Sequence, residues 1–308
     1  LASNTTGAYN TALGHSALDA NTTASNNTAI GYAAATNLTT GTKNTALGQS
    51  ALEGCVDGTN NVAIGYETGT ADWGDANVAV GYRALKVNTA STNVAVGKEA
   101  MLSNTTGTNN VAVGGQALDA NTTASYNTAI GYRTLYVNTT GQYNTAMGVY
   151  ALDANTTASE NTAVGSFTLT NTTTGSANTG LGYNVLADNQ TGSYNTAVGM
   201  RSLKSNLTDY NTAVGYHALE ENTTGASNTA VGANALDDCT TGQLNVAIGR
   251  NALTALTTGE KNVSVGYNAG ANFTDSEDNV SIGQQASEAN STGDRNIAIG
   301  TRALDNNT

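Results

Sequence analysis

The chain has 308 residues, with no proline, 35 glycines, 2 phenylalanines, 1 tryptophan, 11% charged residues and a net charge of -12. An ordinary globular enzyme carries about 25% charged residues and more large apolar ones, so this composition argues against that class. The negative charge argues against a nucleic-acid-binding protein, which needs clustered Lys and Arg. The chain is too poor in proline and charge for a typical disordered protein. It also lacks the run of ~20 apolar residues that membrane insertion would require.

Residues 1–9 match the second half of a repeat that then fills residues 10–308. The pentapeptide Asn-Thr/Val-Ala-Val/Ile-Gly, or a close variant, begins 18 times, at a spacing of 17 residues or, in three cases, 16. The copies begin at Asn10, Asn27, Asn44, Asn61, Asn77, Asn93, Asn110, Asn127, Asn144, Asn161, Asn178, Asn195, Asn211, Asn228, Asn245, Asn262, Asn279 and Asn296. We number the consensus N-T-A-V-G-Y-x-A-L-x-x-N-T-T-G-x-x as positions 1 to 17. Since no linker interrupts the array, residues 1–308 are predicted to form a single repeat domain. Because the array begins and ends within a repeat, we expect it to be an excerpt of a longer one.

Each copy predicts one coil of an all-β parallel β-solenoid, or β-roll, of about 18 coils. A repeat of 17 residues is too short for a pair of helices, and Asn, Thr, Val and Gly are poor helix formers. Identical residues should then stack from coil to coil. The predicted ladders are formed by Asn at position 1 (Asn10, Asn27 and Asn195) and by Gly at position 5 (Gly14, Gly31 and Gly199). The glycine is expected to have a positive φ or to admit a closely packed neighbour.

Side chains alternate along a strand, so positions 2 and 4 share one face. We assign this face to the core, with Val198 as an example, because both positions are rich in Val, Ile and Leu. Leu203, at position 9, should close over it, whereas the small residue at position 3 should point outward. A coil with so few apolar side chains gains from burying another face against partner chains, so we expect a homotrimer.

The sequences Asn61-Val62-Ala63-Ile64-Gly65 and Asn245-Val246-Ala247-Ile248-Gly249 resemble the S-V-A-I-G-x-x-A motif of the head repeats of YadA-like trimeric autotransporter adhesins. The longer consensus also looks like repeats of phage tail fibres. This resemblance covers nearly the whole chain and implies a left-handed, trimeric β-roll in an extracellular fibre, on a virion or a cell surface. The expected function is a structural shaft without enzymatic activity. The alternative is an ice-binding β-solenoid that uses the threonines of positions 13 and 14.

Tyrosine recurs at position 6 and, less often, at position 17. Exposed aromatic rows can bind sugars or proteins, so the position 6 tyrosines are candidate contacts for a host glycan or protein receptor. They can equally pack as strand-forming residues over the roll or at a trimer interface. The position 6 tyrosines are Tyr32, Tyr66, Tyr82, Tyr132, Tyr183, Tyr216 and Tyr267.

The remaining reactive side chains predict neither catalysis, nor a metal site, nor a cofactor. His15 and His217 are the only histidines and lie twelve coils apart, so they are expected to be isolated surface residues. Cys55 and Cys239 share position 12 but lie eleven coils apart, so they cannot bond within one chain. They are expected to be free thiols, unless the turn faces a trimer axis and permits an interchain bond.

Position 10 is acidic in eight copies, and we interpret this row as a solvated edge rather than a calcium ladder. The acidic residues are Asp19, Glu53, Asp119, Asp153, Glu220, Asp237, Glu288 and Asp305. Asn-x-Thr/Ser sequons recur in the turn, where they indicate either glycosylation or simple turn composition. The sequons include Asn21, Asn104, Asn121, Asn138, Asn155 and Asn222.

Overall fold

The computed structural model describes residues 1–305, and its two compact units meet in sequence at Thr157 and Ala158. The first unit contains β1 (Thr11–Leu13), β2 (Thr28–Ile30), β3 (Thr45–Leu47), β4 (Val62–Ile64), β5 (Val78–Val80), β6 (Val94–Val96), β7 (Val111–Val113), β8 (Thr128–Ile130) and β9 (Thr145–Met147). The second unit contains β10 (Thr162–Val164), β11 (Thr179–Leu181), β12 (Thr196–Val198), β13 (Thr212–Val214), β14 (Thr229–Val231), β15 (Val246–Ile248), β16 (Val263–Val265), β17 (Val280–Ile282) and β18 (Ile297–Ile299). The described residues contain no helix. The last part of the predicted array, residues 306–308, lies outside them.

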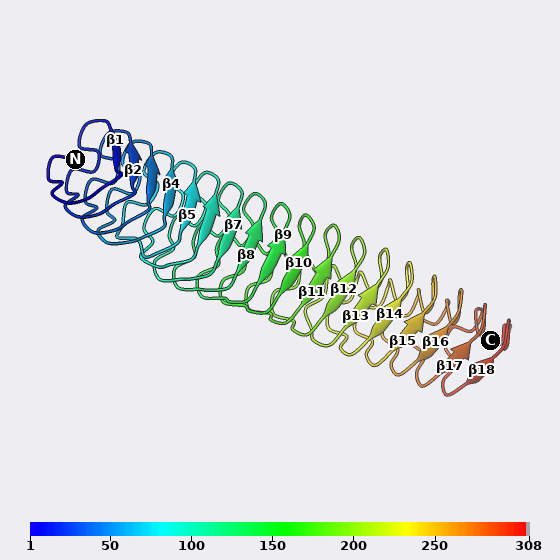
Figure 1. The fold of residues 1–308 in the computed structure, drawn as a ribbon. Coiled ribbons are helices and arrows are strands. Elements are labelled where there is room, and N and C mark those ends of the chain that lie inside the picture. Colours follow the sequence, from blue (N-terminus) through cyan, green and yellow to red (C-terminus); the bar gives the residue numbers. More distant parts are fainter. Residues whose placement is uncertain (306–308) are drawn as a thin grey trace. The chain divides into compact units, whose positions relative to one another are not determined.

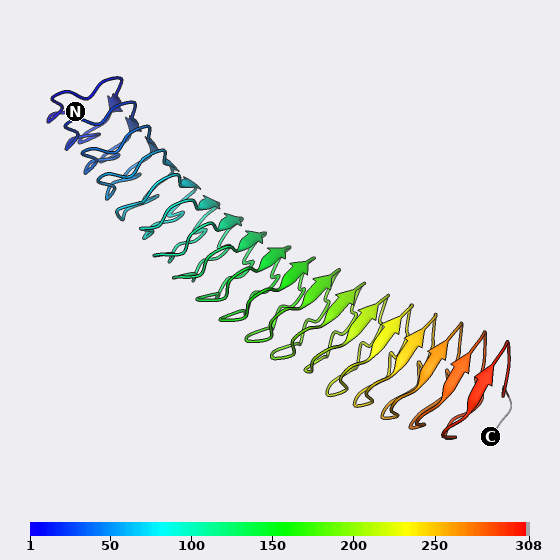
Figure 2. The ribbon, with the colours of Figure 1, turned by 60° about the horizontal axis from the view of Figure 1, so that its bottom comes forward.

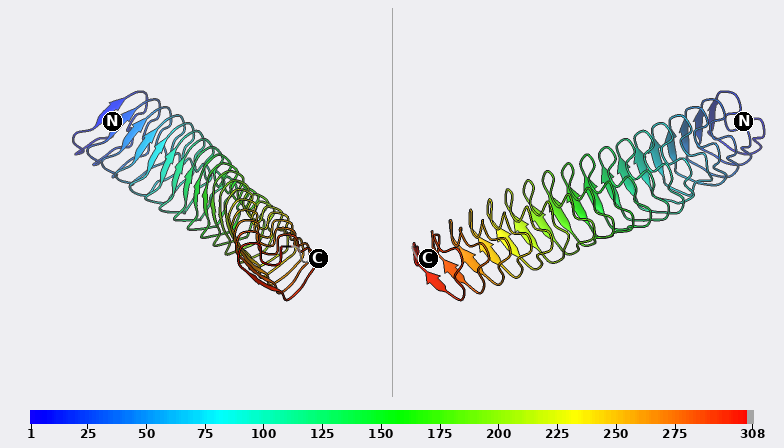
Figure 3. Two further views of the ribbon diagram at one scale, coloured as in Figure 1. Left: turned by 90° about the vertical axis from the view of Figure 1, so that its right-hand side faces the viewer. Right: turned by 180° about the vertical axis from the view of Figure 1, so that it is seen from behind.

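Both units are parallel β-solenoids, as predicted. Every strand occupies positions 2 to 4 of a repeat and pairs in register with the strand of the next repeat, from β1 to β9 and again from β10 to β18. In Figure 1 the arrows of each unit lie side by side on one face of the coils, and the remaining residues loop round behind them. Figures 2 and 3 show the same arrangement from other directions, with one strand in each coil. The single-domain assignment stays a prediction.

The prediction of which strand face is buried was wrong. Position 3 points into the coil: apart from Ala12 in the first coil, every residue there is buried, and Ala197 has no exposed surface. Positions 2 and 4 point outward, and none of their residues in the described strands is buried. Val198 is therefore a half-exposed residue of the outer face and not part of the core.

The narrow interior of the coil explains this inversion. Leu203 and the other position 9 leucines, apart from the exposed Leu304 of the last coil, are buried, as predicted, and reach across the interior toward the strand. A Cβ built on Gly180, at position 3, would meet Thr168 Cγ2 at 2.6 Å and Leu169 Cδ1 at 3.6 Å, side chains of positions 8 and 9. Only a very small residue fits under the strand opposite such neighbours, because protein interiors are close-packed. The larger Val, Ile and Leu are left on the outer face.

The predicted ladder of position 1 asparagines is confirmed. Asn27 Nδ2 donates to the carbonyl of Gly41 in its own coil at 2.9 Å, and Asn27 Oδ1 accepts the Asn44 backbone N–H at 2.8 Å. Asn10 and Asn195 make the same two kinds of bond. These bonds satisfy buried polar groups in each coil, which a buried amide requires. The amide therefore ties the strand to the turn of its own coil and to the strand of the next.

A second asparagine ladder, at position 12, was missed by the sequence analysis. Asn121 Nδ2 donates to Asn104 Oδ1 of the preceding coil at 2.6 Å and to the carbonyl of Ala124 at 3.0 Å. The six sequon asparagines singled out from the sequence all belong to this row, and all are fully buried. In the folded chain their side chains are inaccessible, so the sequons reflect the ladder rather than a glycosylated edge.

Glycine at position 5 meets both predicted requirements. Gly14, Gly31 and Gly199 have φ values of 135°, 138° and 119°, which side chains rarely tolerate. A Cβ on Gly31 would also come within 2.6 Å of the carbonyl carbon of Gly48 in the next coil. Glycine is therefore required both for its backbone conformation and for the close stacking of the coils.

Two coils replace the leucine of position 9 by glycine and place an aromatic ring in the vacated space. Gly69 lies against Trp73, and Gly270 lies against Phe273. Both rings are buried, with exposures of 1% and 0%. This exchange of volume keeps the interior filled, as a close-packed core requires. It also places the only tryptophan of the chain in the core of the first unit.

Candidate functional site

The most regular surface feature of each unit is the outer face of its strands. It consists of two rows of side chains, position 2 (Thr, Val or Ile) and position 4 (Val, Ile, Leu or Met), without a charged residue. Several of the position 4 side chains are well exposed, including Leu47 at 42%, Leu181 at 47% and Ile248 at 40%. An exposed face without charge that carries an apolar row at position 4 is a candidate protein–protein interface.

The seven predicted tyrosines of position 6 are all exposed, between 40% for Tyr66 and Tyr82 and 57% for Tyr32. Tyr66 and Tyr82 stack on each other, with ring centroids 5.6 Å apart and planes 7° from parallel. At position 17, Tyr126 and Tyr143 stack in the same way at 5.1 Å. The surface location was predicted correctly, and stacking between coils accounts for part of the pattern. Receptor binding by these rings stays a prediction.

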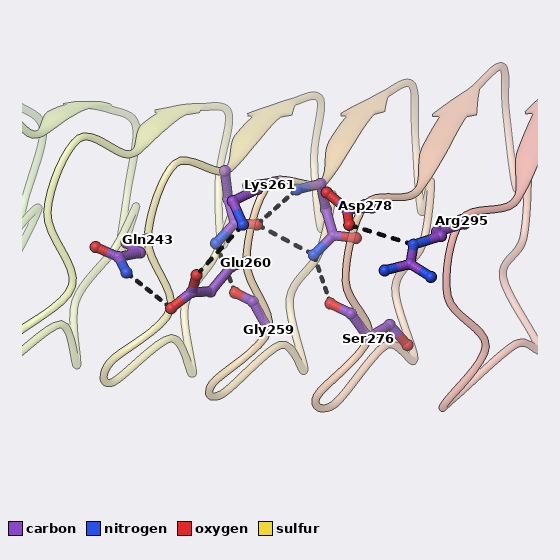
Figure 4. Close-up of polar contacts among 9 residues, drawn as sticks. Gln243, Gly259, Glu260, Lys261, Ser276, Asp278 and Arg295 are labelled. Carbon is purple, nitrogen blue, oxygen red and sulfur yellow. Dashed lines mark hydrogen bonds and ion pairs between the residues drawn. The ribbon is translucent and has the colours of Figure 1, made fainter.

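The outer edge at positions 16 and 17 carries polar contacts between neighbouring coils of the second unit. Gln243 Nε2 donates to Glu260 Oε1 at 2.8 Å, and Arg295 Nε lies 3.7 Å from Asp278 Oδ2 (Figure 4). The carbonyls of Gly259 and Ser276, also shown there, accept bonds from the position 1 ladder. Exposed pairs of this type contribute little stability, so this edge mainly keeps the surface polar.

The interpretation of position 10 as a solvated edge was wrong for most of its residues. Among the described residues of this row, Asp19 is exposed and Glu220 is buried, with 3% exposure, while the other six are half-buried. Burial and, to a lesser extent, the charge of Glu99 in the preceding coil together raise the pKa of Asp119 to about 6. The position 10 side chains lie against position 7 of the preceding coil. In some coils that residue is an arginine, as in the pair of Arg133 and Asp153, where Nε lies 3.4 Å from Oδ1.

Asp119→Asn is expected to stabilise the first unit near neutral pH. The pKa of Asp119 is about 6 in the folded chain, above the ordinary aspartate value of 3.8, so folding favours its protonated form. Stability should therefore fall as pH rises from about 4 to about 6, and should stay low above that range. Removing the charge should then gain no more than about 1 kcal/mol at neutral pH, because solvent screens a half-buried group.

Thermal unfolding followed by the fluorescence of Trp73, buried in the same unit, measures this effect. The gain in Tm should disappear at about pH 4, where the aspartate is protonated in both states. Asp19→Asn, at the same position but exposed, should leave stability within about 0.5 kcal/mol at either pH. A gain for Asp119→Asn that persisted unchanged in acid would contradict a charge effect.

The structure adds His217 and Arg201 to two carboxylates of the position 10 row, Glu220 and Asp237, and so forms a group of four ionisable side chains. His217 Nδ1 lies 2.7 Å from Glu220 Oε2, and Arg201 Nη2 contacts Glu220 Oε1. Asp237, one coil further on, completes the group, and burial followed by the charge of Glu220 raises its pKa to about 6. The signal for this group lay in the sequence. His217 and Glu220 occupy positions 7 and 10 of one coil, and Asp237 occupies position 10 of the next.

The other histidine and the two cysteines lie apart from this group. His15 stacks on Tyr32, with ring centroids 5.4 Å apart, and lies in the first unit, whereas His217 lies in the second. Cys55 and Cys239 are free thiols, and both are fully buried in the position 12 row. Burial raises their pKa values to about 12 and about 11. Buried inside the coil, they cannot reach another chain, so the interchain disulfide is ruled out for this fold.

No protein-family profile matches the chain, and no curated protein matches it. A search of residues 1–305 for a helix long and apolar enough to cross a membrane finds none. No pocket occurs in the described part of the chain.

Proposed function

We propose that this chain is the shaft segment of an extracellular fibre, of the kind formed by phage tail fibres and cell-surface adhesins. The observation that carries the proposal is the in-register repetition of one coil. The strands are flanked by asparagine at position 1 and glycine at position 5, which form ladders from coil to coil. Such ladders hold neighbouring coils together by identical contacts, so the length of the structure can grow with the number of repeats. A shaft that separates two ends of a fibre requires this property.

We further propose that three copies associate through the outer strand face. The small residues of position 3, which were expected to point outward, are buried inside the coil and cannot form the interface. We assign the interface to the rows of positions 2 and 4 instead, because they are exposed and carry no charge. Charged residues are depleted at the centres of interfaces. Position 6 follows the strand closely in the sequence of each repeat. Its exposed tyrosines are the candidate contacts for a host glycan or protein.

Sedimentation analysis of the intact chain tests the assembly. We expect a mass three times the 31.1 kDa of one chain. Ile248→Lys, on the outer face, should dissociate the trimer without changing the far-UV circular dichroism spectrum, because this residue is 40% exposed. Thr241→Lys, on the exposed turn of a nearby coil, is the matched control and should stay trimeric. A folded wild-type monomer would refute the trimer, and a trimer that survives Ile248→Lys would refute the chosen face.

The ice-binding alternative relied on the threonines of positions 13 and 14. Several position 13 hydroxyls donate to a backbone carbonyl of the next coil, as Thr105 does to Thr122 at 2.9 Å and Thr223 does to Thr240 at 2.9 Å. These bonds give the threonine row a role in joining coils, which a shaft needs as well. A shaft should show no thermal hysteresis, whereas an ice-binding protein must show it.

A further inference from the structure

The strongest candidate for a site outside the repeat ladders is the cluster formed by His217, Glu220 and Asp237. The imidazole and carboxylate ligand atoms of these three residues all lie within 4.8 Å of one another. Two neighbouring coils supply them, the coils that begin at Asn211 and Asn228. Among the described residues, this is the one group of three or more His, Cys, Asp or Glu side chains close enough to share a metal ion.

The burial of the cluster sets it apart from an exposed acidic patch. The side chain of Glu220 is only 3% exposed, and that of His217 is 18% exposed. The Tyr216 ring stacks on His217 with centroids 3.8 Å apart and covers one face of the imidazole. Buried carboxylates need a cation, because desolvation of an uncompensated charge is costly.

Arg201 meets that need only in part. Its Nη2 atom forms an ion pair with Glu220 Oε1, while the buried Arg201 Nε has no hydrogen-bond partner within the described residues. One guanidinium also leaves the second carboxylate, that of Asp237, uncompensated when it is ionised. The side chain of Arg201 is 37% exposed, so it can turn toward solvent without crossing the core.

We propose that His217, Glu220 and Asp237 bind one divalent transition-metal ion, with Zn²⁺ as the ion that best fits the ligand set. Imidazole nitrogen and carboxylate oxygen are both zinc ligands, and a water molecule can complete the tetrahedron around three protein ligands. Ca²⁺ and Mg²⁺ prefer sets made of oxygen alone, so the imidazole selects against them. His217 binds through Nδ1, the ring nitrogen that already faces Glu220 at 2.7 Å. On binding, Arg201 moves out, and the ion joins two adjacent coils.

Calorimetric titration of the untagged, full-length chain with ZnCl₂ tests the proposal. We expect one Zn²⁺ per chain, a higher Tm in the presence of the ion, and no competition from Ca²⁺ or Mg²⁺. His217→Asn and Asp237→Asn should each raise the dissociation constant at least about 10-fold, since each removes a direct ligand. His15→Asn, which removes the only other histidine, is the matched control and should bind as the wild type does.

Glu220→Gln should weaken zinc binding to a similar extent, but it removes a buried ion-pair partner, so the fold of this variant must be verified by circular dichroism. Asp237→Asn keeps the test decisive if that variant unfolds, because Asp237 is half-buried and forms no ion pair among the described residues. Absence of zinc binding by the wild type would overturn the proposal. Binding that survives both His217→Asn and Asp237→Asn would overturn it as well, because the ion would then sit elsewhere.

Discussion

Ala197→Arg is expected to prevent the second unit from folding stably. Ala197 lies in the middle of β12, has no exposed surface and pairs in register with Gly180 and Ala213. The narrow interior leaves no room for a long side chain, and the guanidinium would lose its hydration without gaining a partner. The cost should exceed about 3 kcal/mol, among the largest effects of single substitutions. Urea unfolding followed by far-UV circular dichroism measures it.

Val198→Arg is the matched control, because it places the same side chain on the opposite face of the same strand. Val198 is half-exposed, so the arginine can extend into solvent, and the chain should keep its circular dichroism spectrum. If three copies associate through this face, the control should lower the sedimenting mass while each chain stays folded. The reverse result, with Val198→Arg unfolded and Ala197→Arg folded, would restore the inward assignment of positions 2 and 4.

The contrast between these two residues shows what sequence reasoning could predict about the strand. The period of two correctly places Ala197 and Val198 on opposite faces. It does not say which face is inside, and hydrophobicity alone favours the valine. The decision comes from the volume of the side chains that approach from the opposite wall, such as Leu203. That volume depends on how tightly the rest of the coil turns, a property of the fold rather than of the strand.

The sequence gives no indication of how tightly each coil turns, and the backbone conformations show why. Residues at positions 7 and 9 have positive φ in each coil although most are not glycine, as with Arg201 at 60° and Leu203 at 49°. Left-handed conformations are uncommon for such side chains, so no sequence signal announces them. They fold the segment back sharply and bring position 10 against the preceding coil. The burial of Glu220 and its contact with His217 follow from this geometry.

The asparagines illustrate the same limit. Asn at position 1 precedes a strand in every copy and was correctly predicted to form a ladder, because its invariance within the array needs a structural cause. Asn at position 12 stands in a segment of turn composition, and Asn is common in turns for local reasons. Only the closed coil shows that Asn121 faces inward and binds Asn104 of its neighbour. Where Cys55 or Cys239 replaces it, the side chain is buried too.

Gly215→Ala is the second substitution expected to have a large effect. Gly215 has a φ of 145°, and a Cβ there would lie 2.6 Å from the carbonyl carbon of Gly232 in the next coil, closer than any real contact permits. The alanine must both adopt a backbone conformation that side chains rarely reach and push two coils apart. Strained conformations cost about 1–3 kcal/mol each, and the clash adds to that, so the loss should exceed about 3 kcal/mol.

Gly300→Ala separates these two contributions. Gly300 has a similar φ of 126°, but a Cβ there would meet no atom of the described residues within 4 Å. Its substitution should therefore show the conformational cost alone, about 1–3 kcal/mol. Urea unfolding of both variants, followed by far-UV circular dichroism, gives the difference. A larger loss for Gly215→Ala means that the spacing between coils is what demands glycine at position 5 throughout the array. Equal losses would mean that the backbone conformation alone imposes it, and that the coils can separate to admit a methyl group.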